Sequence, residues 1–172
     1  KGKIWYQEGR LEPINVPAVD EWLSDKGHHT FNLEKLTEDS FENVRPRGVI
    51  GMVPGEIVTT DAGYASEVNA ADDILKIAVI ERHRHTGHIG IGYLKGYGLK
   101  EGAVATSISH DSHNIIVVGS NDDDMAAAAN RIIENNGGIA VVNQGQILGE
   151  VTLEIAGLMG EKAVAGVNDA LG

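Results

Sequence analysis

The pattern of hydrophobic and polar positions along the chain predicts a strand-rich fold. Short apolar runs bounded by Gly, Pro, Asn or Asp are typical of strands in a packed sheet. The predicted strands span residues 49–53, 57–60, 74–80, 103–107, 115–118, 139–142 and 147–153. Because few helical segments separate them and no regular βαβ alternation is present, the pattern indicates an α+β fold with mixed or antiparallel sheets.

One segment, residues 122–134, has the pattern of an amphipathic helix. Ser120 or Asn121 can cap its first turn, and three successive aspartates place negative charge at the positive end of the helix dipole. Asn136 and Gly137 tolerate the left-handed conformation that ends many helices. The apolar stripe consists of Met125, Ala128, Ala129, Ile132 and Ile133.

The N-terminal region has a different character. Residues 3–7 and 10–14 predict a hairpin around Glu8 and Gly9, and a short helix is predicted after Pro17, with His28 and His29 in the loop that follows. A lone hairpin is marginally stable in water, so we expect it to pair with strands outside this chain. The start has no signal-peptide pattern and no initiator Met, and we interpret it as the cut end of a longer protein.

Length and composition limit the possible functions. The 172 residues suit one domain but not a complete (β/α)₈ barrel, which needs at least roughly 200 residues. A net charge of −11 disfavours nucleic-acid and anionic membrane partners. Cysteine is absent, which excludes disulfides and thiolate metal sites and is compatible with a cytoplasmic location.

Glycine is concentrated in one segment, and it predicts a shaped connection over residues 87–102 rather than a nucleotide site. Gly90, Gly92 and Gly96 give the spacing G-x-G-x-x-x-G, one residue longer than the dinucleotide-binding fingerprint. So many glycines favour close backbone packing. We expect this connection to lie against a neighbouring domain.

Five of the seven histidines lie in two short stretches. If the strand at 74–80 continues, Glu81, His83 and His85 share one face and form a weak candidate ligand set for iron, manganese or zinc. Arg82 and Arg84 are expected to be solvated or paired with acids. The candidates for a polar pocket or an interface are His83, His85, His88, His110, Asp111, Ser112, His113 and Asn114. A purely structural role for both stretches is the third alternative.

The chain resembles the C-terminal domain of bacterial adenine deaminase. The resemblance is carried by the runs IAVIERH at 77–83, SHDSHNIIVVG at 109–119 and IAGLM at 155–159, by Thr86-Gly87, and by glycines at 96, 98 and 102. It extends to residues 50–60, Asp124-Met125 and Asn130, and so covers nearly the whole chain.

This resemblance implies a hydrolase of the amidohydrolase superfamily that converts adenine and water to hypoxanthine and ammonia in purine salvage. It implies three parts: a barrel that holds iron or manganese, a small β-sandwich whose last strands are residues 1–14, and a C-terminal α+β domain at 15–172. The expected partners are therefore adenine, the barrel and the β-sandwich, together with further copies in a homo-oligomer. No catalytic residue or bound metal is expected in this chain, which is expected to be inactive alone.

Two alternatives remain. The first is a structural or oligomerisation domain with no group near the substrate. The second is an independent metal hydrolase that uses Glu81, His83, His85, His110 and His113.

Overall fold

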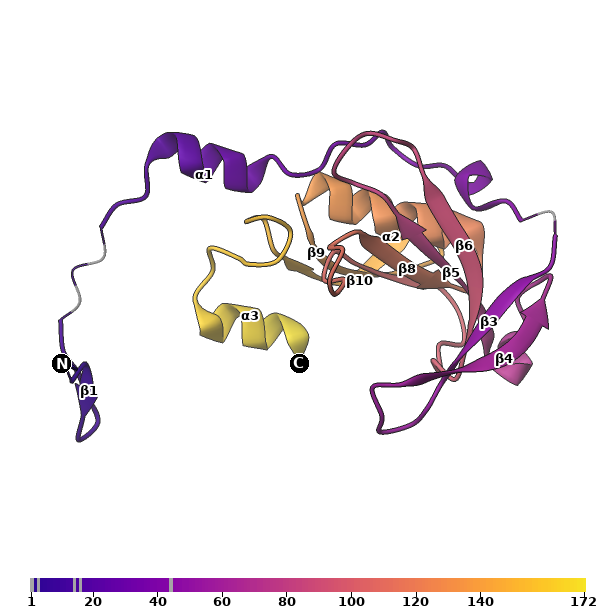
Figure 1. The fold of residues 1–172 in the computed structure, drawn as a ribbon, viewed down its shortest axis with the longest axis horizontal. Helices are drawn as coiled ribbons and strands as arrows, with labels where there is room; N and C mark the ends of the chain where they lie inside the picture. Colours follow the sequence, from indigo (N-terminus) through magenta and orange to yellow (C-terminus); the bar gives the residue numbers. More distant parts are fainter. Residues whose placement is uncertain (1, 3, 14, 16, 44) are drawn as a thin grey trace.

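The computed structural model describes residues 2, 4–13, 15, 17–43 and 45–172, and its main feature is one eight-stranded sheet. The strand order is β10-β9-β7-β8-β5-β6-β3-β4 (Figure 1). These strands are β3 Arg47–Met52, β4 Thr59–Ala65, β5 Ile74–Ile80, β6 Ile89–Lys95, β7 Ala103–Thr106, β8 Ile115–Gly119, β9 Gly138–Asn143 and β10 Gln146–Thr152.

The sheet is mixed, because β3 and β6 run parallel while the other neighbouring strands pair antiparallel. Helix α2, Asp122–Glu134, follows β8 directly, and it has the predicted bounds. The helices α1, Glu21–His28, and α3, Val164–Leu171, complete the set, with short 3₁₀ turns at Glu38–Phe41 and Ala70–Asp72. The prediction of an α+β fold without a closed barrel is confirmed.

Helix α2 covers one face of the sheet, and the core lies between them. Small residues line the strands under the helix, so the helix packs close to the sheet: Ala103, Ala105 and Ala140 are fully buried. Met125 and Ile132 of the predicted apolar stripe are buried against them. The Asn121 side chain caps the helix by accepting a hydrogen bond of 2.8 Å from the Asp124 amide.

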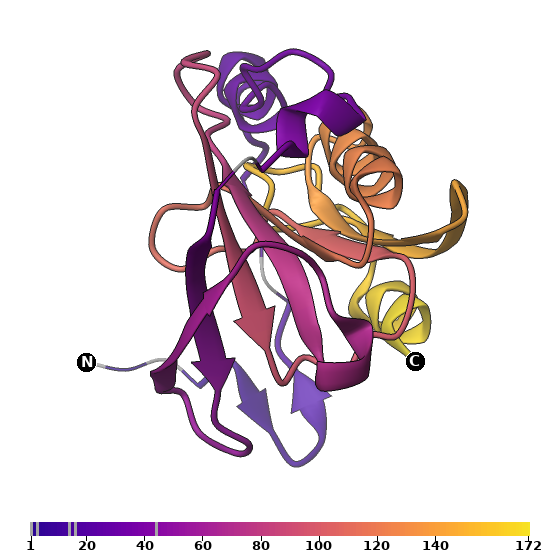
Figure 2. The same cartoon turned by 90° about the vertical axis from the view of Figure 1, so that its right-hand side faces the viewer.

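The opposite face of the sheet is covered only at its margins. Helix α3 lies under β10 at one side, so α2 and α3 flank the sheet from opposite directions (Figure 2). At the opposite margin of this face, Val68 and Leu99 pack on Leu75 and Leu94. None of the helices in the described ranges combines the length and the apolar character needed to cross a membrane.

The structure corrects several sequence predictions. The segment 87–102, predicted as a connection, contains strand β6, because its isoleucines and glycines alternate with the period of a strand. His28 is the last residue of α1 rather than part of a loop, and α3 was not predicted. Strand β4 begins at Thr59, later than predicted, and extends to Ala65.

The N-terminal region stands apart from the sheet (Figure 1). The predicted hairpin consists of β1, Tyr6–Gln7, and β2, Arg10–Leu11, and it turns at Glu8 and Gly9. Among the described residues these two strands pair only with each other. The outer ends of the predicted strands, Lys3 and Ile14, lie outside the described residues. Assignment of residues 1–14 to a preceding domain stays a prediction.

Candidate functional site

The candidate site lies where β5 ends, and its centre is the Arg82 side chain. Only 1% of Arg82 is exposed. Its Nη1 donates to the Thr30 carbonyl and hydroxyl oxygens at 3.0 Å, and its Nη2 donates to the Ala156 carbonyl at 2.9 Å. Its Nε donates to the His113 carbonyl. The guanidinium also stacks on Phe31, 4.2 Å from the ring centroid.

The guanidinium therefore joins segments that are far apart in the sequence. All of its acceptors among the described residues are neutral oxygens, and burial lowers the pKa of Arg82 below its usual value. The expectation that Arg82 is solvated or paired with an acid is wrong. A five-donor fork satisfies several carbonyls of irregular backbone at once, which explains why an arginine is found at this position.

The two histidine stretches meet at this point. His83 Nε2 lies 2.9 Å from the Ser112 carbonyl oxygen. Because a carbonyl oxygen only accepts hydrogen bonds, Nε2 must carry the proton in this contact. Together with the bond from Arg82 to His113, this contact fixes the position of the β7–β8 connection, residues 109–114.

Hydrogen bonds within the 109–114 turn stabilise it, and two of its side-chain polar atoms have no partner among the described residues. Ser109 Oγ lies 3.2 Å from Ser112 Oγ, and the His113 amide donates to the Ser109 carbonyl at 2.6 Å. Within the described part of the chain, His113 Nδ1 and Asn114 Oδ1 are buried without a hydrogen-bond partner. A buried water can satisfy these two atoms, and a group supplied from outside this chain can bind them once the turn shifts to expose them.

His110 and Asp111 lie at the tip of the turn. Their side chains are 91% and 87% exposed, and His110 Nε2 is 2.8 Å from the Asp111 carboxylate. Both side chains are therefore accessible to an approaching molecule.

Glu81 ties down the loop that follows β5. Its carboxylate accepts hydrogen bonds from the His83 and Arg84 amides at 2.6 and 2.9 Å, and from the Thr86 hydroxyl at 2.8 Å. Partial burial opposes ionisation, but these hydrogen bonds outweigh it and lower the pKa of Glu81 to about 2. The carboxylate is therefore ionised at neutral pH and engaged within its own loop.

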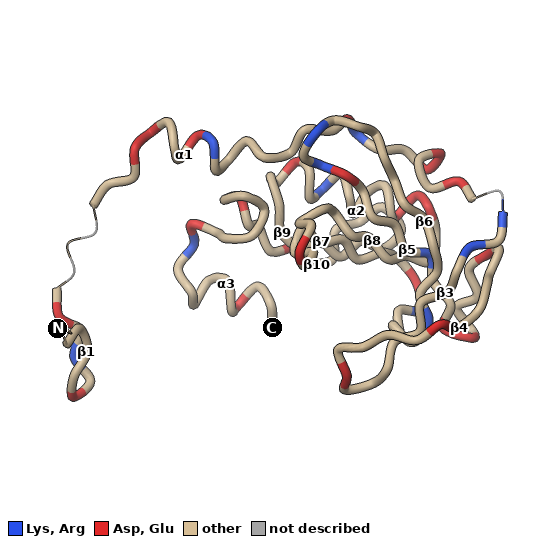
Figure 3. Tube along the Cα trace, in the orientation of Figure 1, with Lys and Arg blue, Asp and Glu red and all other residues tan. Residues whose placement is uncertain are grey.

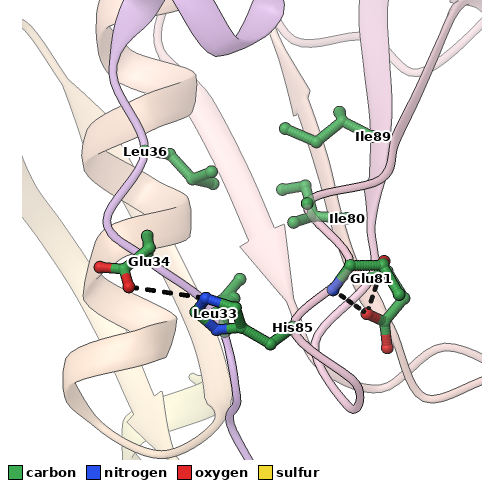
Figure 4. Close-up of a pocket in the computed structure, with 9 residues that line it drawn as sticks. Leu33, Glu34, Leu36, Ile80, Glu81, His85 and Ile89 are labelled. Atoms are coloured by element: carbon green, nitrogen blue, oxygen red, sulfur yellow. Dashed lines mark hydrogen bonds and ion pairs between the residues drawn. The ribbon is translucent and has the colours of Figure 1, made fainter.

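His85 faces a different neighbour from His83. It has a left-handed backbone, φ 53°, and its Nε2 lies 3.6 Å from Glu34. Figure 4 shows this pair at the rim of a cavity of about 200 Å³. The cavity is lined by Leu33, Glu34, Leu36, Ile80, Glu81, His85, Thr86, Gly87 and Ile89. His88 lies at the exposed end of the same loop, where its amide donates to Thr86 Oγ1.

The proposed ligand face of Glu81, His83 and His85 does not form. Strand β5 ends at Ile80, so the alternation on which that prediction depended stops before Glu81. Within the described residues, no group of three or more His, Asp or Glu side chains is arranged to hold a metal ion. The donors of the described residues therefore do not fit an iron or manganese centre.

The lowered pKa of Glu81 leads to a testable prediction about stability. The carboxylate contributes stability above its unfolded value of about 4.5, and this contribution is lost as the pH falls toward 2. We expect urea unfolding midpoints of the wild type to fall more steeply between pH 5 and pH 2 than those of Glu81→Gln. Glu56→Gln, at an exposed loop position, is the control and should follow the wild type. Parallel curves for wild type and Glu81→Gln would contradict this assignment.

Comparison with known proteins places these features in context. The family model described as "Adenine deaminase C-terminal domain" matches residues 55–172. An adenine deaminase of Brucella melitensis is 41% identical over 179 aligned positions, which cover 98% of this chain and 31% of the relative. One from Bacillus velezensis is 45% identical over 147 positions, 80% of this chain and 26% of the relative. Adenine deaminase 2 of Carboxydothermus hydrogenoformans is 42% identical over 179 positions, 99% of this chain and 31% of the relative. The chain thus spans about 31% of the length of such relatives.

Proposed function

Because the chain belongs to the adenine deaminase C-terminal domain family, we propose that it is the C-terminal part of an enzyme that hydrolyses adenine to hypoxanthine and ammonia. Relatives named adenine deaminase match nearly the whole of this chain, and they support this reaction. In this proposal the catalytic barrel belongs to the portion of the relatives that this chain does not span. In this proposal the same portion holds the metal, iron or manganese, since no group of three or more His, Asp or Glu side chains among the described residues is arranged to hold one.

Within that enzyme, we assign the 109–114 turn and His83 to the rim of the active site. The observation that carries this assignment is the unpaired state of His113 Nδ1 and Asn114 Oδ1 in a turn held by Arg82 and His83. Adenine and its leaving ammonia offer both hydrogen-bond donors and acceptors, so one ring nitrogen and one amide oxygen suit them. A histidine there can orient the base or move a proton.

The test uses the full-length enzyme with alanine at His110 or His113. We expect His113→Ala to lower kcat/KM for adenine by roughly a hundredfold, the lower end of the effects for a lost positioned acid or base. His110→Ala should have a smaller effect, because its side chain is 91% exposed. Adenine loss is followed by ultraviolet absorbance, and His29→Ala, at the exposed end of α1, is the control. Full activity of both folded variants would reject the assignment.

One further observation favours a structural role as the second candidate. Arg82 directs all its hydrogen bonds to backbone or hydroxyl oxygens inside the chain. A purely structural domain predicts that variants in both histidine stretches alter folding or oligomer size but leave turnover per folded enzyme unchanged. Sedimentation velocity measured beside activity separates the two candidates.

The proposal extends to cellular context. We propose a cytoplasmic homo-oligomer in purine salvage, in which residues 1–14 complete a preceding β-sandwich and 15–172 form the C-terminal domain. Hairpin β1–β2, which makes no strand pairing with the rest of the described chain, supports this division.

A further inference from the structure

The sheet face opposite α2 carries an apolar patch at the end nearest the 109–114 turn. Ala78, Ile80, Ala105 and Val117 point to the α2 side and are nearly fully buried. Their neighbours along the strands therefore point to the opposite side. The register sets them in two rows across β7, β8, β5 and β6. We call this patch the open face, and it includes Thr106, Ile116, Ile77, Val79, Gly90 and Gly92.

The open face is covered in part by this chain: Val79 and Gly90 are exposed, whereas its other four members are half-buried, with Ile77 packed against Leu75, Leu94 and Val118. Val79 is 37% exposed although Ala78 and Ile80 beside it are 0% and 2% exposed. None of the six positions is charged, in a chain with 23% charged residues. The charged residues lie mainly on loops, helices and strand ends (Figure 3). Antiparallel sheets that leave one face in water normally show polar residues on it, so an apolar face indicates a partner.

Gly90 adds an independent indication. Ile89 and Ile91 pack on the α2 side, so Gly90 between them points to the open face. A Cβ added at Gly90 would meet no atom closer than the Val79 carbonyl oxygen at 4.0 Å, and its φ is not in the left-handed region. Nothing within the described chain therefore requires a glycine there, although glycine weakens a strand by roughly 0.5–1 kcal/mol. A close approach of another backbone or side chain to β6 explains it.

We infer that the remainder of the same polypeptide, the part of an adenine deaminase that this chain does not span, docks on the open face. This inference rests on the proposed function. The relatives are about three times as long as their match to this chain, which spans 31% of them, so a large covalently attached partner exists in each of them. Attachment gives an effective concentration in the millimolar range, so even a modest apolar patch suffices.

Position favours this occupant over a second copy of the chain, because covalent attachment keeps the remainder of the polypeptide beside this domain at any protein concentration. The open face also borders the candidate site, since Thr106 and Ile116 flank the β7–β8 connection and Ile108 beside it is 49% exposed. A domain seated on the open face therefore contacts the turn that carries His113 and Asn114.

The test measures the accessibility of thiols introduced into the full-length enzyme. This chain contains no cysteine, so Val79→Cys and Thr106→Cys each add a thiol that is identified by its own peptide in mass spectrometry. We expect both to react with a maleimide at least about tenfold more slowly than Ile147→Cys, at a position on β10 that is 48% exposed. Two thiols are used so that a folding defect in one variant leaves the other informative.

A second variant tests whether the protection comes from docking. Gly90→Val, added to Val79→Cys, places a side chain on the open face whose Cβ meets no atom of the described chain closer than 4.0 Å, and it should raise the alkylation rate about tenfold. Gly149→Val is the matched control, because a Cβ there meets no atom within 4 Å and the position lies outside the open face. Rates equal to that of Ile147→Cys would overturn the inference. Protection lost on dilution to monomers, followed by sedimentation, would identify a second copy and overturn it as well.

The outcome is separable from the proposed function. An enzyme that deaminates adenine while Val79→Cys reacts freely keeps the function and rejects the docking. An inactive protein in which both thiols are protected keeps the docking and rejects the proposed function.

Discussion

Replacement of Gly138 by alanine is expected to prevent folding of this chain or to destabilise it by more than about 4 kcal/mol, which is exceptional for one substitution. Gly138 begins β9 with φ +133°, a conformation that residues with a Cβ rarely adopt. A Cβ built there lies 1.8 Å from the Val151 carbonyl oxygen on the paired strand β10. That oxygen belongs to backbone held in the sheet, so no side-chain rotation relieves the clash.

The effect should reach the candidate site as well. The Gly138 amide donates to Ser107 Oγ at 2.8 Å, and Ser107 Oγ in turn donates to the Gly157 carbonyl. Gly157 follows Ala156, whose carbonyl accepts from Arg82. A shifted β9 therefore moves one of the segments that the Arg82 guanidinium joins.

The measurement is urea unfolding followed by far-ultraviolet circular dichroism, with soluble yield recorded beside it. Gly149→Ala is the matched control, since its Cβ meets no atom within 4 Å and its φ is not in the left-handed region. We expect Gly149→Ala to change stability by less than about 1 kcal/mol. A Gly138→Ala protein with an unchanged unfolding midpoint would show that the β9–β10 junction relaxes and that the structural argument is wrong.

Strands and a helix that are specified by their own local sequence could be predicted. Residues 74–80 and 115–118 are short apolar runs between turn residues, and both form strands. The aspartates and the apolar stripe of 122–134 specify both the start and the buried face of α2. Strand order could not be predicted in this way. The pairing of β7 with β9, which are separated in the sequence by β8 and α2, depends on packing between distant segments.

Strand β6 was missed for a physical reason. Its glycines at 90 and 92 lower strand propensity and suggest a loop when residues are read singly. The alternating isoleucines at 89 and 91 were the signal that could have identified it, because period-two alternation is typical of a strand with one buried face.

The candidate site was predicted in part. Sequence proximity identified both histidine stretches, and the structure brings His83 to Ser112, 29 positions away. The predicted ligand face does not form because β5 ends at Ile80. Beyond it, the Glu81 carboxylate accepts hydrogen bonds from backbone amides of the loop that follows. The role of Arg82 depends on the carbonyls of three distant segments, and no pattern in the sequence brings those together.

Replacement of Arg82 by methionine is expected to destabilise the chain by about 3–5 kcal/mol, the range for a broken buried polar network. Methionine fills a similar length of apolar space and removes the cost of burying a charge. It leaves the carbonyls of Thr30, His113 and Ala156 without their donor, at about 1–3 kcal/mol for each one that stays buried. The losses exceed the gain because the partners are not replaced together with the guanidinium.

Arg82→Lys separates charge from geometry. An ammonium keeps the positive charge, but it loses the planar stack on Phe31 and cannot place donors at the Nε, Nη1 and Nη2 positions together. We expect a loss of about 2 kcal/mol in urea unfolding, intermediate between wild type and Arg82→Met. Arg84→Met, two residues further along and exposed, should stay within about 0.5 kcal/mol of wild type.

The same variants report on the 109–114 turn. If the guanidinium positions His113, folded full-length Arg82→Lys should lose kcat for adenine beyond what its remaining folded fraction explains, whereas Arg84→Met should not. An Arg82→Met chain as stable as wild type would mean that waters replace the lost donors, and the guanidinium would then not be what holds these segments together. Since Nε bonds the His113 carbonyl directly, a stable variant with unchanged kcat would also separate the turn from Arg82 and leave the contact from His83 to Ser112 to position it.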